Sequence, residues 1–200
     1  MLYDKLRNHN LILASASPRR QRFFREMGLD FEIRLKPVKE VYPDELKGSA
    51  ISDYLAELKA SAFDGTLTSN EILITSDTVV WHKERSLAKA ADVEEAFAML
   101  RTLSGEEHEV ITSVCFTFAA DQDTVRRKTV RQITKVRFKE LTDEEIRFYI
   151  DNYAPFDKAG AYGIQEWIGL IGIESIEGSY PNVVGLPSQV VYKTLMDMVG

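Results

Sequence analysis

Hydrophobic residues recur with two different spacings along this chain, and each spacing predicts a kind of element. Continuous or strictly alternating apolar runs predict strands, whereas apolar residues three and four positions apart predict helices. The predicted strands begin at Leu11 and continue with 31–35, 72–81, 110–118 and 124–138. The predicted helices begin at Pro18 and continue with 49–63, 92–103, 142–152 and a last segment after Pro187. This alternation is typical of an α/β protein.

Local chemistry supports the start of three of these helices. Ser17 is a favourable N-cap, and Pro18 suits the first helical position because its missing N–H costs nothing there. Two further starts carry the pattern of a capping box, Asp92 with Glu95 and Thr142 with Glu145.

The middle of the chain predicts an antiparallel hairpin. Residues 110–118 alternate strictly, with Val114 on one face and Cys115 on the other, and 124–138 is a long and more polar strand. A turn is expected at 121–123 between them. We therefore predict an α/β fold with a mixed sheet and flanking helices, arranged in two lobes rather than as one plain parallel sheet.

Composition narrows the class of protein. The 200 residues, 44% of them hydrophobic, suffice for one domain with a real core. A net charge of −6 disfavours a nonspecific nucleic-acid or anionic-membrane surface. One cysteine, Cys115, excludes an intrachain disulfide and fits a reducing compartment. We see no signal-peptide pattern and no apolar run near the ~20 residues of a membrane span, so we expect a cytoplasmic protein.

Two arginines, Arg19 and Arg20, fall in the first turn of the predicted helix, where the helix dipole disfavours cations. They are either solvated and tolerated, or neutralised by an anion. A strand-to-helix turn already offers free backbone N–H groups to an anion, and Ser15 and Ser17 add hydroxyl donors. Arginine also binds phosphate oxygens bidentately. This agreement favours an anion site, in which case replacing either arginine should not destabilise the empty protein.

A carboxylate stands inside an apolar run in Ser76-Asp77-Thr78. Burying a charge in a strand is costly unless it is paired or bound to a metal, so Asp77 is a candidate metal ligand or general base. The alternative is a strand that ends at Thr75, with Asp77 in a surface turn.

Two glycine-rich segments follow in the second half. DKAGAYGIQ (157–165) can approach a ligand closely, and Gln165 offers both a donor and an acceptor for the edge of a base, although an ordinary turn is the simpler interpretation. We expect a structural role for GSYPNVVGLP (178–187). The chain lacks the GxSxG, HExxH and GxxxxGK[ST] patterns, and His82 and His108 have no partner at metal-ligand spacing.

Taken in order, several motifs closely resemble the Maf family of nucleoside triphosphate pyrophosphatases: LASASPRR, LAELKA, SDTVV, LSGEEHEVITSV, DKAGAYGIQ and GSYPNVVGLP. The resemblance spans essentially the whole chain. It implies a single domain over residues 1–200, with two lobes around a central cleft, similar to inosine triphosphate pyrophosphatases. It also implies a homodimer that cleaves a nucleoside triphosphate between its α- and β-phosphates.

The resemblance implies roles for particular residues. Asp77 matches the catalytic proton acceptor, and Glu40 matches an acid that would help Asp77 to hold a divalent cation, Mg²⁺ or Mn²⁺. The positions linked to substrate choice are Arg19, Thr78 and Gln165. The positions that contact phosphate are Ser15, Ser17, Arg20, Lys59 and Lys89.

Within the family, DKAGAYGIQ and the Pro18-Arg19-Arg20 segment resemble the subfamily that acts on dTTP and UTP. Two positions depart from the family pattern: Lys39 replaces one of two acids, and Ala90 replaces the proline after Lys89. The alternatives are the same chemistry on other or methylated nucleotides, or a nucleotide-responsive regulator of septum formation.

Overall fold

The computed structural model describes residues 1–119 and 125–199. The turn expected at 121–123 lies outside the described residues. In the described part no helix is both long and apolar enough to cross a membrane.

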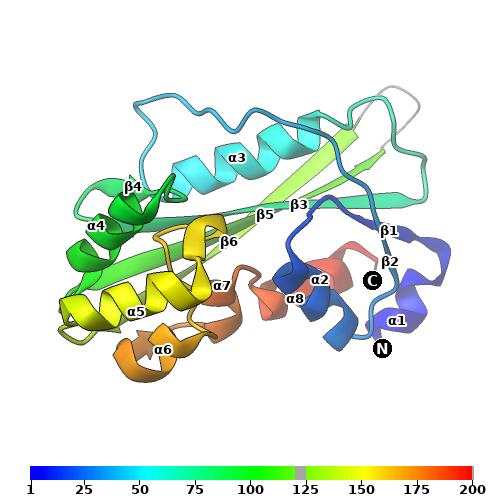
Figure 1. Cartoon of the computed structure of the whole chain (residues 1–200). Helices are drawn as coiled ribbons and strands as arrows, with labels where there is room; N and C mark the ends of the chain where they lie inside the picture. Colours follow the sequence, from blue (N-terminus) through cyan, green and yellow to red (C-terminus); the bar gives the residue numbers. More distant parts are fainter. Residues whose placement is uncertain (120–124, 200) are drawn as a thin grey trace.

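One mixed sheet forms the centre of the molecule (Figure 1). Its strands are β1 (Asn10–Leu13), β2 (Phe31–Ile33), β3 (Glu71–His82), β4 (Arg85–Leu87), β5 (Glu107–Ala119), β6 (Val125–Phe138) and β7 (Ile173–Glu177). The order is β2-β1-β3-β5-β6-β7, and β4 pairs with β3 outside this path. β1 runs parallel to β2 and β3, and the remaining pairs are antiparallel.

Helices cover both faces of this sheet. They are α1 (Leu2–Lys5), α2 (Pro18–Glu26), α3 (Ser49–Ser61), α4 (Val93–Leu103), α5 (Asp143–Tyr153), α6 (Trp167–Gly172), α7 (Tyr180–Val184) and α8 (Ser188–Met198), with 3-10 turns η1 (Leu6–Asn8) and η2 (Pro155–Asp157). Figure 1 shows α3 along one face, α2 and α8 against the other face at one end, and α5 and α6 at the opposite end. The predicted mixed α/β class is confirmed.

The alternation of apolar residues decides which helix each strand residue meets. On β3, Ile72 and Ile74 pack with Phe24 of α2 and Leu195 of α8, whereas Leu73 packs with Ala56 of α3. Further along the chain, β3 and β5 also contribute to a second cluster under α4, α5 and α6. Two apolar cores at opposite ends thus share the same two central strands.

The predicted starts of the helices are confirmed. The Thr142 side chain and the Glu145 side chain form a reciprocal capping box. The Asp92 carboxylate caps α4 by accepting from the Glu95 N–H at 2.8 Å, but the Glu95 carboxylate accepts from the Ala91 N–H, so the second predicted box is only half formed. The predicted hairpin is also present, with Val114 opposite Val130. Cys115 is fully buried, as its apolar surroundings indicate.

The strand predictions were incomplete at three places, one of which is the short strand β4, which was not predicted. β2 ends at Ile33 rather than at residue 35, because β1 offers partners only as far as Leu13, which lies opposite Ile33. β7 was missed, because four of its five residues are exposed and it therefore lacks an apolar signature. It forms a strand because it pairs with the end of β6.

His108, on β5, predicts how stability depends on pH. Burial, with a smaller contribution from His82, lowers its pKa from 6.5 to about 3, and its Nε2 lies 2.7 Å from the Tyr162 hydroxyl. Between these pH values the unfolded chain binds a proton that the folded protein does not, so stability falls as the pH drops below about 6.5. We expect this residue to contribute a loss of about 3 kcal/mol in the free energy of unfolding between pH 6.5 and pH 4.

Urea unfolding at both pH values checks this, with His108→Gln as the comparison. The variant cannot take up the proton, so its stability should depend less steeply on pH. An unchanged dependence would mean that other groups carry the acid sensitivity.

Candidate functional site

The site lies at a gap in the edge of β3. β1 pairs with residues 71–74 of β3 and β4 pairs with 80–82, so between these pairs no described strand covers that edge. β3 continues through the gap to His82, which excludes the alternative that the strand ends at Thr75. Because neighbouring strand residues point to opposite faces, Asp77 faces α3 and Thr78 faces α2.

Asp77 meets a lysine and a second carboxylate on the α3 face. The Lys59 Nζ lies 2.6 Å from the Asp77 Oδ1 and 3.2 Å from the Glu40 Oε1. Asp77 is only 7% exposed, and burial raises the pKa of its carboxyl although Lys59 opposes that shift. A carboxylate with a raised pKa is better suited to accept a proton near neutral pH than an exposed one.

Arg20 occupies the other face of the gap. Its guanidinium donates three hydrogen bonds, to the Gly185 carbonyl at 2.8 Å, the Ser76 carbonyl at 3.0 Å and the Thr78 Oγ1 at 3.0 Å. Burial lowers the pKa of Arg20. Arg20 therefore joins α2, β3 and the segment after α7, with two of its five N–H groups left over.

These contacts argue against the expectation that Arg20 can be replaced without cost to the empty protein, and we now expect its loss to be destabilising. The dipole argument considered only the helix, whereas Arg20 also satisfies two backbone carbonyls. The 178–187 segment likewise does more than shape a turn, because Val183, Val184 and Gly185 line the cleft.

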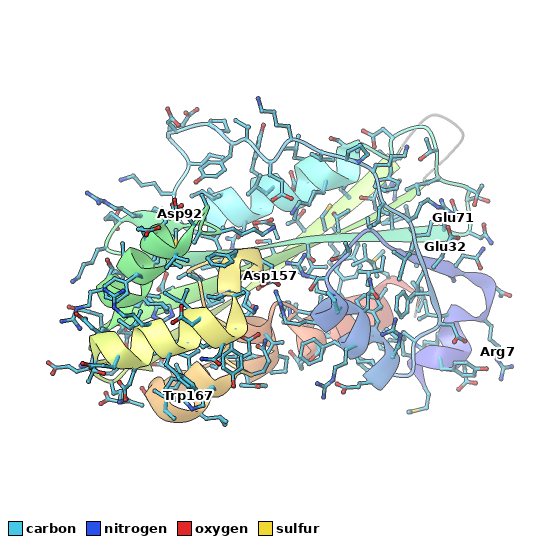
Figure 2. All side chains as sticks on the ribbon, in the orientation of Figure 1. Arg7, Glu32, Glu71, Asp92, Asp157 and Trp167 are labelled. Carbon is cyan, nitrogen blue, oxygen red and sulfur yellow. The ribbon has the colours of Figure 1, made fainter. Side chains whose placement is uncertain are left out.

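Arg19 reaches across to the segment 157–166. Its Nη1 lies 3.0 Å from the Asp157 Oδ2, and the Asp157 Oδ1 lies 2.7 Å from the Lys158 Nζ. Figure 2 places Asp157 near the centre of the molecule, where η2 approaches α2. The sequence interpretation did not single out Asp157 or Lys158, although the adjacent opposite charges at the start of DKAGAYGIQ were an available signal.

The backbone of this segment is bent tightly beneath the cleft. Gly160 and Ala161 both have positive φ, 68° and 54°. A Cβ at Gly160 would lie 3.0 Å from the Val80 side chain. Glycine here therefore allows the segment to pack directly on β3.

A continuous cleft joins these groups. One part, of about 360 Å³, is lined by apolar side chains together with Tyr42, Tyr162 and Gln165. An adjoining part, of about 630 Å³, borders the N-terminus of α2 and adds Lys36. Both parts share Ser17, Arg19, Arg20, Glu40, Lys59, Lys89 and Asp157.

Every site residue predicted from the sequence lines this cleft: Ser15, Ser17, Arg19, Arg20, Glu40, Lys59, Asp77, Thr78, Lys89 and Gln165. The cations gather where the two parts meet, beside the first turn of α2, where Pro18 has no N–H and the Arg20 N–H bonds to the Ser17 hydroxyl. Such a site suits a ligand with several negative charges at one end and an uncharged, flat group at the other.

The carboxylates fit a divalent cation that arrives with its ligand. The described residues contain no cluster of three or more metal-ligating side chains. Glu40 and Asp77 nevertheless converge on one cation, Lys59. Mg²⁺ is commonly held by one or two carboxylates together with substrate phosphates and water, so this pair fits such an ion.

Fold and cleft together define an α/β protein whose cleft is lined by several cations and suits a polyanion. The sequence family model "Maf-like protein" matches residues 10–198, and the chain belongs to that family. A dTTP/UTP pyrophosphatase of Flavobacterium johnsoniae is 54% identical over the full length of both chains. One of Bacteroides fragilis is 45% identical, covering 96% of this chain and 98% of its own.

Among solved structures, a HAM1 protein from Coxiella burnetii matches with a TM-score of 0.47 and 13% identity, covering 94% of this chain and 99% of its own. The family membership rests on the sequence matches.

Proposed function

We propose that this protein is a nucleoside triphosphate pyrophosphatase that hydrolyses dTTP and UTP to the monophosphate and pyrophosphate. The observation that carries the proposal is the Asp77 carboxylate, buried at the edge gap of β3 and paired with Lys59 in a cationic cleft. The names of relatives at 54% and 56% identity support the substrates.

In this proposal Asp77 accepts the proton of the attacking water. The water oxygen bonds to phosphorus, the bridge between the α- and β-phosphates breaks, and pyrophosphate leaves with the bridging oxygen. Such reactions depend mostly on positioning and on stabilising charge. Lys59 holds the Asp77 carboxylate in place for this role.

The triphosphate lies at the junction of the two parts of the cleft. Ser15, Ser17, Arg19, Lys59 and Lys89 contact it, together with the remaining N–H groups of Arg20. To bind phosphate, Arg19 must give up its ion pair with Asp157. The new bond to a phosphate oxygen offsets part of the cost of separating that exposed pair.

A divalent cation, Mg²⁺ or Mn²⁺, would be held by Glu40 and Asp77 with oxygens of the substrate. When bound, it supplies charge that stabilises the phosphates during cleavage. Lys39 stands where the family resemblance implies a further acid, so the protein itself would contribute two carboxylates.

The base lies in the apolar part of the cleft, where Gln165 can bond to its edge. Thr78 acts indirectly in this proposal, because its hydroxyl already contacts Arg20 and Thr112. Arg19 contributes to substrate choice from the mouth of the cleft. A homodimer and a cytoplasmic location stay predictions of the family resemblance.

A pyrophosphate-release assay over all standard NTPs and dNTPs tests the proposal. With Mg²⁺ or Mn²⁺ we expect dTTP and UTP to have the highest kcat/KM, and EDTA to abolish release. Preference for a purine nucleotide would refute the substrate assignment, and no release from any nucleotide would refute the enzyme.

A further inference from the structure

Glu166 stands behind the base-binding part of the cleft and is held by two hydrogen bonds and one ion pair. Its Oε2 accepts a hydrogen bond from the Tyr149 hydroxyl, and its Oε1 lies 3.1 Å from the Lys158 Nζ and 3.3 Å from the Gln165 Nε2. Its side chain is only 20% exposed. The carboxylate is thus held on two sides by residues that do not belong to the predicted site.

Tyr149 and Lys158 act as hydrogen-bond donors toward Glu166. Burial, together with Glu166, raises the pKa of the Tyr149 phenol, which therefore stays protonated. The Gly163 N–H donates to the Tyr149 oxygen at 2.9 Å, so the phenol proton is free to point at Glu166. Lys158 is a donor only, so Tyr149 and Lys158 both present hydrogens to the Glu166 oxygens.

A carboxylate decides which end of a neighbouring amide it meets. The Glu166 carboxylate can only accept hydrogen bonds, so the Gln165 amide must turn its Nε2 toward it. The Gln165 Oε1 would be repelled in that position. The polar atom that Gln165 can still offer as an acceptor is its carbonyl oxygen. Gln165 itself lines the apolar part of the cleft.

Gly163 makes this arrangement possible. A Cβ at this position would lie 2.7 Å from the Gln165 Nε2 and 2.8 Å from the Glu166 Cδ. Both side chains therefore fold back over a backbone that has no side chain of its own. The pairing of Gln165 with Glu166 is built into the segment 157–166.

We propose that Glu166 is a positioning residue that turns the carbonyl oxygen of Gln165 toward the base and so selects bases with an imide N–H. The inference rests on the proposed function and deepens it. Uracil and thymine carry a donor at N3, whereas cytosine carries an acceptor there. A fixed acceptor on Gln165 thus bonds to UTP and dTTP alike and opposes the N3 of CTP.

The experiment compares kcat/KM for UTP and CTP in the wild type, in Glu166→Gln and in the matched control Glu144→Gln. Glu144 is exposed on α5 and does not line the cleft. A glutamine at 166 can present either end of its amide, so Gln165 is no longer held one way. We expect the UTP:CTP ratio to fall about 10-fold, the worth of one mismatched hydrogen bond, in Glu166→Gln only.

A second comparison separates positioning from general damage. In a Gln165→Ala background the ratio should already be lowered, and adding Glu166→Gln should not lower it further. An unchanged ratio in Glu166→Gln, or an equal fall in the Gln165→Ala background, would overturn the inference while leaving the proposed function intact. A wild type that releases pyrophosphate from neither nucleotide would overturn both.

Discussion

Replacing Asp77 with asparagine is expected to lower kcat by about 10²–10⁴-fold, the usual range for loss of a general base. Asparagine has the same shape and can still accept a hydrogen bond from Lys59, but it cannot take up the proton of the attacking water. The variant should therefore fold and bind nucleotide while hydrolysing it slowly.

Steady-state pyrophosphate release from dTTP measures this effect, with thermal unfolding to verify the fold. Asp64→Asn is the matched control, because Asp64 is an exposed aspartate that pairs with Arg127 and does not line the cleft. It should keep wild-type kcat. If Asp77→Asn also kept kcat within a few-fold of wild type, Asp77 would not be the base.

Replacing Arg20 with alanine is expected to lower the free energy of unfolding by about 3 kcal/mol, because the carbonyls of Ser76 and Gly185 lose their buried donor. The same change should raise KM for dTTP, since it removes a cation from the junction of the cleft. Stability and affinity should therefore fall together, unlike in Asp77→Asn.

Urea unfolding without nucleotide measures the stability effect. Arg22→Ala on the same helix is the control. The Arg22 side chain is 75% exposed and, among the described residues, forms its ion pair with Glu26 of its own helix, so little change is expected. If the two variants were equally stable, or Arg20→Ala more stable than wild type, the dipole conflict would outweigh the three hydrogen bonds.

Much of the fold could be predicted because its signals are local. The N-cap at Thr142 and the proline after Ser17 act within one turn of helix, and the alternation along 110–118 reports a strand whose two faces meet different layers. β7 gave no such signal. Its stability as a strand comes from pairing with β6, whose partner residues lie 35 or more positions away in sequence, so no local pattern encodes it.

The residues of the candidate site also fall into those that a local sequence signal identifies and those that it does not. A carboxylate within an apolar strand marked Asp77, and two cations at a helix start marked Arg19 and Arg20, because each is unfavourable in its local setting. This local argument could not identify their partners Glu40 and Asp157, because both lie in polar stretches where a charged side chain is not unfavourable.

By itself the sequence determined the class of fold and marked Asp77, Arg19 and Arg20, because these depend on spacing, capping and the cost of a misplaced charge. The resemblance of its motifs to a known family supplied Glu40, Lys59, Thr78 and Lys89. Tertiary structure alone decided that Lys59 joins Asp77 to Glu40, that Arg20 supports the empty protein, and that Glu166 orients Gln165. Those contacts depend on the folded protein, because they form only once the gap in the edge of β3 lies beside α2, α3 and η2.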